Sequence, residues 1–147
     1  MIRAATLTDL AVLTEIEAAC FGDDAWTSSL VEAELSVATR SVLLSCDDAA
    51  VVGYGSIMVV DNVADLQRIA VLPEARRRCL GRDLLESLLS TAIERGAARI
   101  LLDVAASNEA AMGLYAGFGF TTIARRRGYY ANGSSALVME KSLEKKS

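Results

Sequence analysis

Apolar residues along this chain follow two spacings, one typical of buried strands and one typical of amphipathic helices. The sharpest change between them follows Leu66–Leu72, a stretch rich in branched apolar residues that predicts a buried strand. Pro73, the only proline in the chain, ends this strand because proline supplies no backbone donor. Helical spacing then runs from Leu80 to Ile93, and the pair Arg95-Gly96 predicts the end of that helix.

Two helices are predicted in the first quarter of the chain, after a short strand at Ile2–Ala5. Thr6 and Asp9 have the spacing of a capping box, which opens a helix that runs to about Cys20. Thr27 caps a second helix, which follows Trp26. Its predicted inward residues are Leu30, Val31 and Leu35.

A pair of strands comes next, at Ser41–Cys46 and Val51–Val60, joined by the turn Asp47-Asp48-Ala49. Gly53 and Gly55 lie inside the second of these strands. Because glycine weakens a strand, its presence here predicts a close backbone approach or a bulge.

The last third of the chain predicts three more strands and one short helix. Ser107-Asn108-Glu109 caps the helix, and the Asn132-Gly133 pair predicts a turn. The predicted elements are a strand at Arg99–Val104, a helix ending near Tyr115–Gly117, and strands at Phe118–Arg127 and Leu137–Leu143. The order of elements is β-α-α-β-β-β-α-β-α-β-β, which predicts one mixed α/β domain of six or seven strands over residues 1–143, with a frayed tail at 144–147.

The composition indicates a globular chain. Of its 147 residues 52% are apolar and 23% are charged, which excludes a disordered chain. No apolar run approaches the roughly 18 residues of a membrane span, and the N-terminus lacks a secretory signal. Three widely separated cysteines predict reduced thiols in a cytoplasm. The net charge of −4 argues against a nucleic-acid partner and suits a basic or amine partner.

The chain contains no histidine. This excludes Ser–His–Asp and Cys–His nucleophilic schemes and histidine-based metal sites, and we expect no metal. Proton transfer near neutral pH must therefore use carboxylates, Tyr, Cys, Lys or water.

Four arginines gather around the start of the helix that begins at Leu80: Arg76, Arg77, Arg78 and Arg82, with Gly81 among them. The start of a helix presents unpaired N–H groups and a positive dipole end. The stretch therefore predicts a phosphate site. Neither the dinucleotide fingerprint nor the Walker pattern is present, so the phosphate belongs to neither NAD nor ATP.

Several stretches resemble the GNAT N-acetyltransferases, an acetyl-CoA-dependent family with a mostly antiparallel sheet flanked by about four helices. Arg76–Gly81 is similar to the family's R/Q-x-x-G-x-G/A motif, and Asn108–Tyr115 with Gly117–Phe120 resembles its Asn, Leu-Tyr and Gly-Phe stretch. More narrowly, three pieces resemble the RimI-type ribosomal-protein alanine N-acetyltransferases: Ile69–Val71, Ala106–Asn108 and Arg126–Tyr130.

The resemblance implies a site for acetyl-CoA as co-substrate. Ile69–Val71 would pair with the pantetheine arm where the fourth and fifth strands separate, and Arg77–Arg82 would hold the pyrophosphate mainly through backbone N–H groups. Asn108 would contact the pantetheine arm. The implied cofactor-binding residues are Ile69, Ala70, Val71, Arg76, Arg77, Arg78, Cys79, Leu80, Gly81, Arg82 and Asn108.

The resemblance also implies the catalytic residues. Tyr115 would donate a proton to the departing thiolate, and Asp103 would be the general base that acts on the attacking amine. Asp65 is an alternative base, with Glu32 and Glu34 as weaker candidates and solvent alone as a further possibility. Tyr129 and Tyr130 would line the acceptor, or could instead pack within their hairpin. Trp26, the only tryptophan, is a third candidate because it lies beside an acidic turn, and it could instead be a packing residue.

Two positions depart from the family pattern. Cys79 stands where the motif has its first glycine, so a positive φ there would cost on the order of 1 kcal/mol. A reactive thiol and a tolerated small residue are both open interpretations of Cys79. Asp103 stands where RimI-type proteins have Glu, which shortens its reach by roughly 1–1.5 Å and favours a water relay.

Three functions follow from these features. The first is acetyl transfer to the N-terminal amine of a protein, with a ribosomal protein as first candidate. The second is acetyl transfer to a small amine such as an amino acid, a polyamine or a drug. The third is a non-catalytic CoA-binding module. We expect a monomer or a weak dimer.

Overall fold

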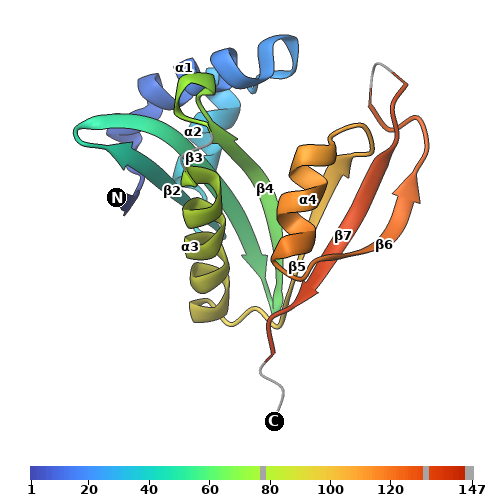
Figure 1. The fold of residues 1–147 in the computed structure, drawn as a ribbon. Helices are drawn as coiled ribbons and strands as arrows, with labels where there is room; N and C mark the ends of the chain where they lie inside the picture. The colour runs from blue at the N-terminus through green and yellow to red at the C-terminus, as the bar shows by residue number, and fades with distance from the viewer. Residues whose placement is uncertain (77–78, 131–132, 145–147) are drawn as a thin grey trace.

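The computed structural model describes residues 1–76, 79–130 and 133–144. These residues form one seven-stranded sheet in the order β1-β2-β3-β4-β5-β7-β6, with helices on both faces (Figure 1). The strands are β1 (Ile2–Ala4), β2 (Arg40–Asp47), β3 (Ala50–Val60), β4 (Val63–Val71), β5 (Arg99–Ala105), β6 (Thr121–Arg126) and β7 (Ala136–Ser142). The helices are α1 (Leu10–Phe21), α2 (Ser28–Ser36), α3 (Leu80–Glu94) and α4 (Glu109–Gly117), with short 3₁₀ helices η1 (Leu7–Asp9), η2 (Gly22–Asp24) and η3 (Pro73–Ala75).

The predicted helix starts are confirmed in the capping contacts. The Thr6 amide donates to the Asp9 carboxylate at 2.8 Å, as the capping box requires. Thr27 Oγ1 accepts from the Leu30 amide at 3.3 Å at the start of α2. The predicted order of elements, the α/β class and the mostly antiparallel sheet are all confirmed.

Each face of the sheet has its own apolar core. Side chains of α3 and α4 pack on one face around Leu88 and Ile100, and those of α1 and α2 pack on the other around Leu13. Leu43 and Leu44 are neighbours on β2. Leu43 packs in the core under α3 and Leu44 in the core under α1, because successive strand residues point to opposite faces.

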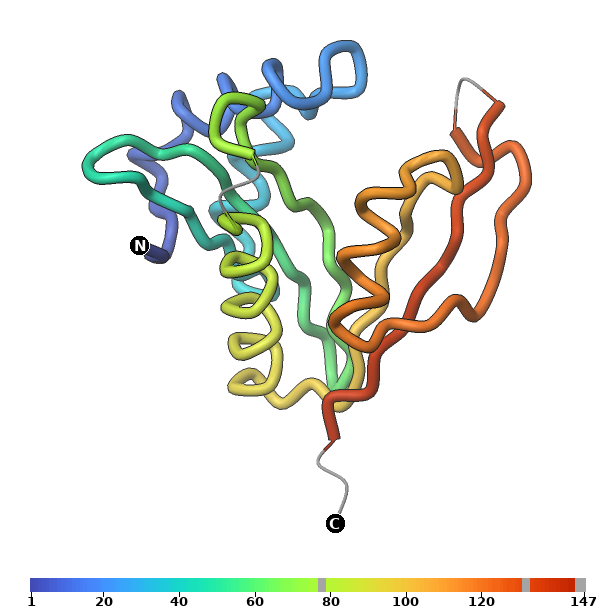
Figure 2. The backbone as a smooth tube through the Cα atoms, viewed as in Figure 1, coloured from blue at the N-terminus to red at the C-terminus, as the bar shows by residue number. Residues whose placement is uncertain are grey.

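The two halves of the sheet separate between β4 and β5. These strands are parallel, and their pairing covers three residue pairs, the last of which is Asp65 with Leu101. Beyond that pair β4 continues against β3 and β5 continues against β7, so the two strands diverge (Figure 2). The separation of the fourth and fifth strands, which the family resemblance implied, is present.

A bulge in β4 changes the face of the sheet to which the side chains of its later residues point. Leu66 is opposite Ile57 and Arg68 is opposite Ser56, so Gln67 has no partner on β3. Leu66 packs against the α3 core, whereas Arg68 reaches Glu17 on α1. Without the extra residue Leu66 and Arg68 would share a face.

The two glycines of β3 allow close approach, as predicted. A Cβ at Gly53 would lie 2.7 Å from the Ala70 carbonyl oxygen, and one at Gly55 would lie 2.4 Å from Leu88 Cδ1. Gly55 therefore lets α3 pack closely on β3.

Three predicted details of the elements are wrong. Strand β4 begins at Val63, because a tight turn at Asp61 returns the chain directly into pairing with β3. Strand β6 begins at Thr121, because the preceding residues finish α4 and turn through Gly119 at φ 93°. Leu30 is 53% exposed, because the short helix α2 turns only the stripe of Val31 and Leu35 inward.

In the described part of the chain no helix is long and apolar enough to cross a membrane. Predicted features at Arg77, Arg78 and Asn132, and most of the predicted tail, lie outside the described residues.

Candidate active site

A pocket of about 390 Å³ lies where β4 and β5 separate. It brings together four residues that the sequence singled out, two carboxylates and two tyrosines. The residues that line it are Asp65, Leu66, Gln67 and Arg68 of β4, Leu101, Leu102 and Asp103 of β5, Val138 of β7, Arg126 of β6, and Tyr129 and Tyr130 after it.

The strand register places the two carboxylates side by side. Asp65 is paired with Leu101, and Asp103 follows two residues later on β5, so all three point to the same face. Asp65 is half-buried, and Asp103 is exposed. Burial raises the pKa of Asp65 and the charge of Asp103 raises it further, against the lowering effect of Arg99 and Arg40.

Replacing Asp65 with asparagine is expected to stabilise the protein at neutral pH. The raised pKa means that the fold favours protonated Asp65, so ionised Asp65 costs stability above the folded-state pKa. The cost disappears as the pH falls below the ordinary aspartate value. We expect Asp65→Asn to raise the free energy of unfolding by up to about 1 kcal/mol at neutral pH, since partial exposure screens the charges.

Denaturant titrations across the acidic range test this expectation, with exposed Glu15→Gln as the control. The advantage of Asp65→Asn should shrink as the pH falls. An advantage that stays constant with pH would contradict the assignment.

The two tyrosines form one wall of the pocket. Their rings meet edge to face with centroids 5.2 Å apart, and Arg126 lies 5.4 Å from the centre of the Tyr129 ring. The Tyr130 amide donates to the Ser134 carbonyl at 3.1 Å. Burial raises the pKa of Tyr130, with smaller contributions from Asp103 and Tyr129.

Tyr115 approaches this region from α4, on the opposite face of the sheet. It is 6% exposed and packs against Phe120 at a centroid distance of 5.7 Å. Burial raises the pKa of Tyr115 to about 12, and Tyr130 contributes to the shift. Its phenol therefore stays protonated throughout the physiological range.

The unpaired edge of β4 leads to the predicted phosphate site. Val71, its last residue, has a carbonyl that accepts from Arg76 Nε at 3.0 Å and from the Cys20 thiol at 3.4 Å. Leu80, Gly81 and Arg82 form the first turn of α3, a 15-residue helix. Asn108 Oδ1 caps α4 by accepting from the Ala111 amide at 3.1 Å.

Cys79 adopts the left-handed conformation that its glycine-like position suggested, with φ 60° and ψ 14°. A non-glycine residue pays about 1–2 kcal/mol for this conformation. Replacing Cys79 with glycine would remove this penalty, but the flexible glycine loses more chain entropy on folding, which costs about 0.5–1 kcal/mol. We expect Cys79→Gly to raise the free energy of unfolding by up to about 1.5 kcal/mol. Urea denaturation tests this, and destabilisation by Cys79→Gly relative to Cys79→Ala would contradict the strain argument.

A buried ionic cluster that was not predicted from the sequence lies beside the pocket. Glu17 of α1 is 0% exposed and accepts two hydrogen bonds from Arg68, Nη2 to Oε1 at 2.8 Å and Nε to Oε2 at 3.0 Å. The Tyr54 hydroxyl and the Trp26 amide, the latter at 2.8 Å, also donate to Glu17. Glu17 lies next to Ile16 on the inner face of its helix, and a charged residue at such a position could have indicated this cluster.

The predicted acceptor residue Trp26 belongs to this cluster and does not line the pocket. Arg68 Cζ lies 4.7 Å from the centre of the Trp26 ring and 3.6 Å from that of Phe21. Burial opposes ionisation of Glu17, but the hydrogen bonds from Arg68, Tyr54 and Trp26 outweigh it and lower the pKa of this carboxyl.

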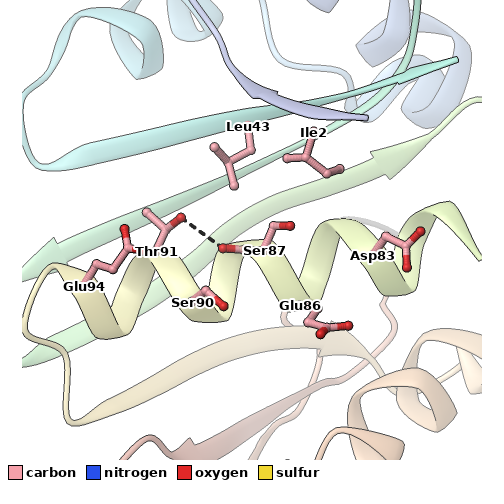
Figure 3. A pocket seen from close by; sticks show the side chains of 8 residues that line it. All are labelled: Ile2, Leu43, Asp83, Glu86, Ser87, Ser90, Thr91 and Glu94. Carbon is pink, nitrogen blue, oxygen red and sulfur yellow. Dashed lines mark hydrogen bonds between the residues drawn. The ribbon is translucent and has the colours of Figure 1, made fainter. Parts of the chain in front are cut away.

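A second hollow, of about 500 Å³, lies on the outer side of α3 against β1 and β2 (Figure 3). Ile2 and Leu43 face hydroxyls and carboxylates of α3, and Thr91 Oγ1 donates within the helix to the Ser87 carbonyl at 3.0 Å. The described residues that line it include none of the predicted site residues. Within the described chain no three His, Cys, Asp or Glu side chains form a group that could hold a metal ion.

Comparison with known proteins gives the family. The sequence model of the acetyltransferase (GNAT) family matches residues 10–120. The chain is 32% identical over 146 residues to the N-alpha-acetyltransferase RimI of Mycobacterium tuberculosis, covering 95% of this chain and 90% of that protein.

Solved structures agree with this match. The crystal structure of the ribosomal-protein-S18-alanine N-acetyltransferase from Escherichia coli has a TM-score of 0.92 at 29% identity, over 100% of this chain and 96% of that one. A Salmonella typhimurium structure determined with its cofactor acetyl-CoA shares the fold, with a TM-score of 0.84 at 23% identity over 100% of this chain and 95% of that one. The chain therefore belongs to the GNAT family and is an acetyltransferase that takes its acetyl group from acetyl-CoA.

Proposed function

We propose that this enzyme acetylates the N-terminal amine of a protein, and that a ribosomal protein is the first acceptor to test. The observation that carries the proposal is the pocket at the separation of β4 and β5, where two carboxylates face two tyrosines. The names of the Mycobacterium tuberculosis and Escherichia coli relatives, an N-alpha-acetyltransferase and a ribosomal-protein-alanine N-acetyltransferase, support the same acceptor class.

Asp103 is the general base in this proposal. An N-terminal amine has a pKa of about 8, so it must lose a proton before it attacks the thioester. Asp103 is exposed at the pocket and can take that proton through one water. Asp65 is the alternative base. Its half-buried position and its proximity to Asp103 suit it to hold the incoming ammonium group.

Tyr115 is the general acid. A phenol with a pKa of about 12 donates a hydrogen bond to the developing thiolate at every working pH. Complete transfer to a thiolate, whose conjugate acid has a pKa of about 8.5, would be uphill by about 5 kcal/mol. Such a cost is compatible with enzymatic turnover, and a hydrogen bond to the departing sulfur already stabilises the transition state.

Acetyl-CoA supplies the acetyl thioester, and residues of three elements would hold it. The edge of β4 at Ile69–Val71 has no β5 partner and can pair with amide groups of the pantetheine arm. The N–H groups at Cys79–Arg82 begin α3 and suit a pyrophosphate. Arg76 would release the Val71 carbonyl when that edge pairs with the cofactor. Asn108 at the start of α4 completes the proposed set.

Tyr129 and Tyr130, which line the pocket together with residues of β4 and β5, are the proposed acceptor wall. The three cysteines are free thiols, which supports the cytoplasm as the proposed compartment.

Thiol release from acetyl-CoA tests the function. The panel contains peptides with the N-terminal residues of ribosomal proteins, the same peptides with a blocked N-terminus, and free amino acids and polyamines. We expect turnover on free N-termini alone. Turnover on polyamines without turnover on peptides would overturn the proposal, and acetyl-CoA binding without turnover on any acceptor would indicate a binding module.

A further inference from the structure

Arg68 connects the acceptor pocket to the turn between α1 and α2. The residue lines the pocket. It also donates from Nη2 to the Asp24 carbonyl at 3.0 Å, in addition to its two bonds to Glu17. Arg68 is therefore both part of the pocket wall and bonded to the backbone of the turn.

The bulge at Gln67 makes this connection possible. Asp65 is opposite Met58 and Arg68 is opposite Ser56, so the extra residue brings Asp65 and Arg68 to the same face of β4. Three residues apart in a regular strand, these two side chains would point to opposite faces. The bulge thus sets the candidate base and the arginine on one wall.

The turn is the segment Gly22–Trp26, and the Trp26 ring packs against the apolar core on the α1 face. Within it the Ala25 amide donates to the Gly22 carbonyl at 3.1 Å, and Asp23 and Asp24 are exposed. Its polar contacts to the rest of the domain include the Trp26 amide bond to Glu17, the Asp24 carbonyl bond to Arg68 and the Trp26 ring beside the guanidinium. All three involve the Glu17–Arg68 pair.

We propose that Arg68 is a positioning residue for the acceptor, because it lines the acceptor pocket and holds the Asp24–Trp26 turn beside its own guanidinium. The Glu17 carboxylate orients the guanidinium, and the guanidinium orients the turn. The acceptor chain then meets a preformed surface, which lowers the entropy cost of binding it. This inference rests on the proposed function, since a peptide is the acceptor long enough to reach the turn.

The test uses Arg68→Lys. Lysine keeps the positive charge beside Glu17, but it lacks the planar fork that makes two bonds to the carboxylate and a third to Asp24. The matched control is Arg3→Lys. Arg3, on β1, also makes two hydrogen bonds to a carboxylate, that of Asp9, which directly precedes α1. Steady-state kinetics are measured with an N-terminal peptide and with acetyl-CoA.

We expect Arg68→Lys to raise KM for the peptide about tenfold, because a misplaced binding surface weakens acceptor binding. The kcat and the KM for acetyl-CoA should stay within about twofold, and Arg3→Lys should leave all three unchanged. An unchanged KM for the peptide, or a fall in kcat alone, would overturn the inference.

Fluorescence gives a second readout that needs no acceptor. Trp26 is the only tryptophan in the chain, so intrinsic emission reports on the turn. We expect acrylamide to quench Arg68→Lys at least about twofold more efficiently than wild type, since quenching follows exposure of the ring, while Arg3→Lys matches wild type. Equal quenching in all three proteins would show that Arg68 does not hold the turn.

The two readouts separate the inference from the proposed function. If the wild-type enzyme acetylates no peptide but does acetylate a small amine, the proposed function fails whatever the fluorescence shows. If wild type acetylates peptides and Arg68→Lys keeps both the quenching and the KM of wild type, only the inference fails.

Discussion

Tyr115→Phe is expected to lower kcat by about 10²-fold or more, because it removes the proposed proton donor to the departing thiolate. The ring itself remains, so its packing against Phe120 and the α3 core is kept. The KM for acetyl-CoA and the melting temperature should therefore change little. The substitution separates chemistry from folding, because it deletes one oxygen atom.

The pH dependence sharpens this expectation. Since the pKa of Tyr115 is about 12, the phenol is protonated in the wild-type enzyme at every pH at which the protein is assayed. The ratio of wild-type to Tyr115→Phe rates should be constant between about pH 6 and pH 9. Rapid mixing of enzyme with acetyl-CoA and peptide gives the chemical step directly. Retention of the full rate by Tyr115→Phe would remove Tyr115 from the mechanism.

Arg68→Ala is expected to lower the free energy of unfolding by about 3–5 kcal/mol, the cost of leaving a buried carboxylate without its cation. Glu17 is fully buried, and after the substitution its donors among the described residues would be the Tyr54 hydroxyl and the Trp26 amide. This is the largest loss of stability that we expect from a single substitution near the site. Because of this expected loss, acceptor positioning is tested with Arg68→Lys, which keeps the positive charge beside Glu17.

A double substitution distinguishes the unpaired charge from lost packing. Glu17→Gln in the Arg68→Ala background removes the negative charge while keeping the size of the side chain, so it should recover part of the lost stability. Arg3→Ala, which breaks the pair with Asp9 near the surface, should cost far less. Urea denaturation of the four proteins at neutral pH measures each value. A double variant less stable than Arg68→Ala alone would contradict a cost caused by unpaired charge.

Much of the fold could be predicted from the sequence. The capping box at Thr6 and Asp9, the cap at Thr27 and the apolar spacing of α3 are local signals, because each depends on residues within one or two turns. The order of elements followed from them. The family motifs pointed to Asp65, Asp103, Tyr129 and Tyr130 separately, and the fold gathers these four around one pocket.

The rest depended on contacts between residues far apart in the sequence. Glu17 and Arg68 are separated by 51 positions, and neither looks exceptional by itself. The face that Arg68 serves was decided by a bulge in β4, which exists only in relation to β3. Leu30 belonged to an apolar pattern, but only its neighbours Val31 and Leu35 pack against the core beneath α2. Leu30 itself is exposed.

By itself, then, the sequence determined the helices and strands, their order and the residue types available for proton transfer, since these depend on local spacing and composition. Only the tertiary structure decided that β4 and β5 pair for three residues and then separate. That short pairing sets Asp65 beside Asp103 and leaves the remaining edge of β4 open. Strand register is a property of two segments together, and one segment's residues do not determine where its partner stops.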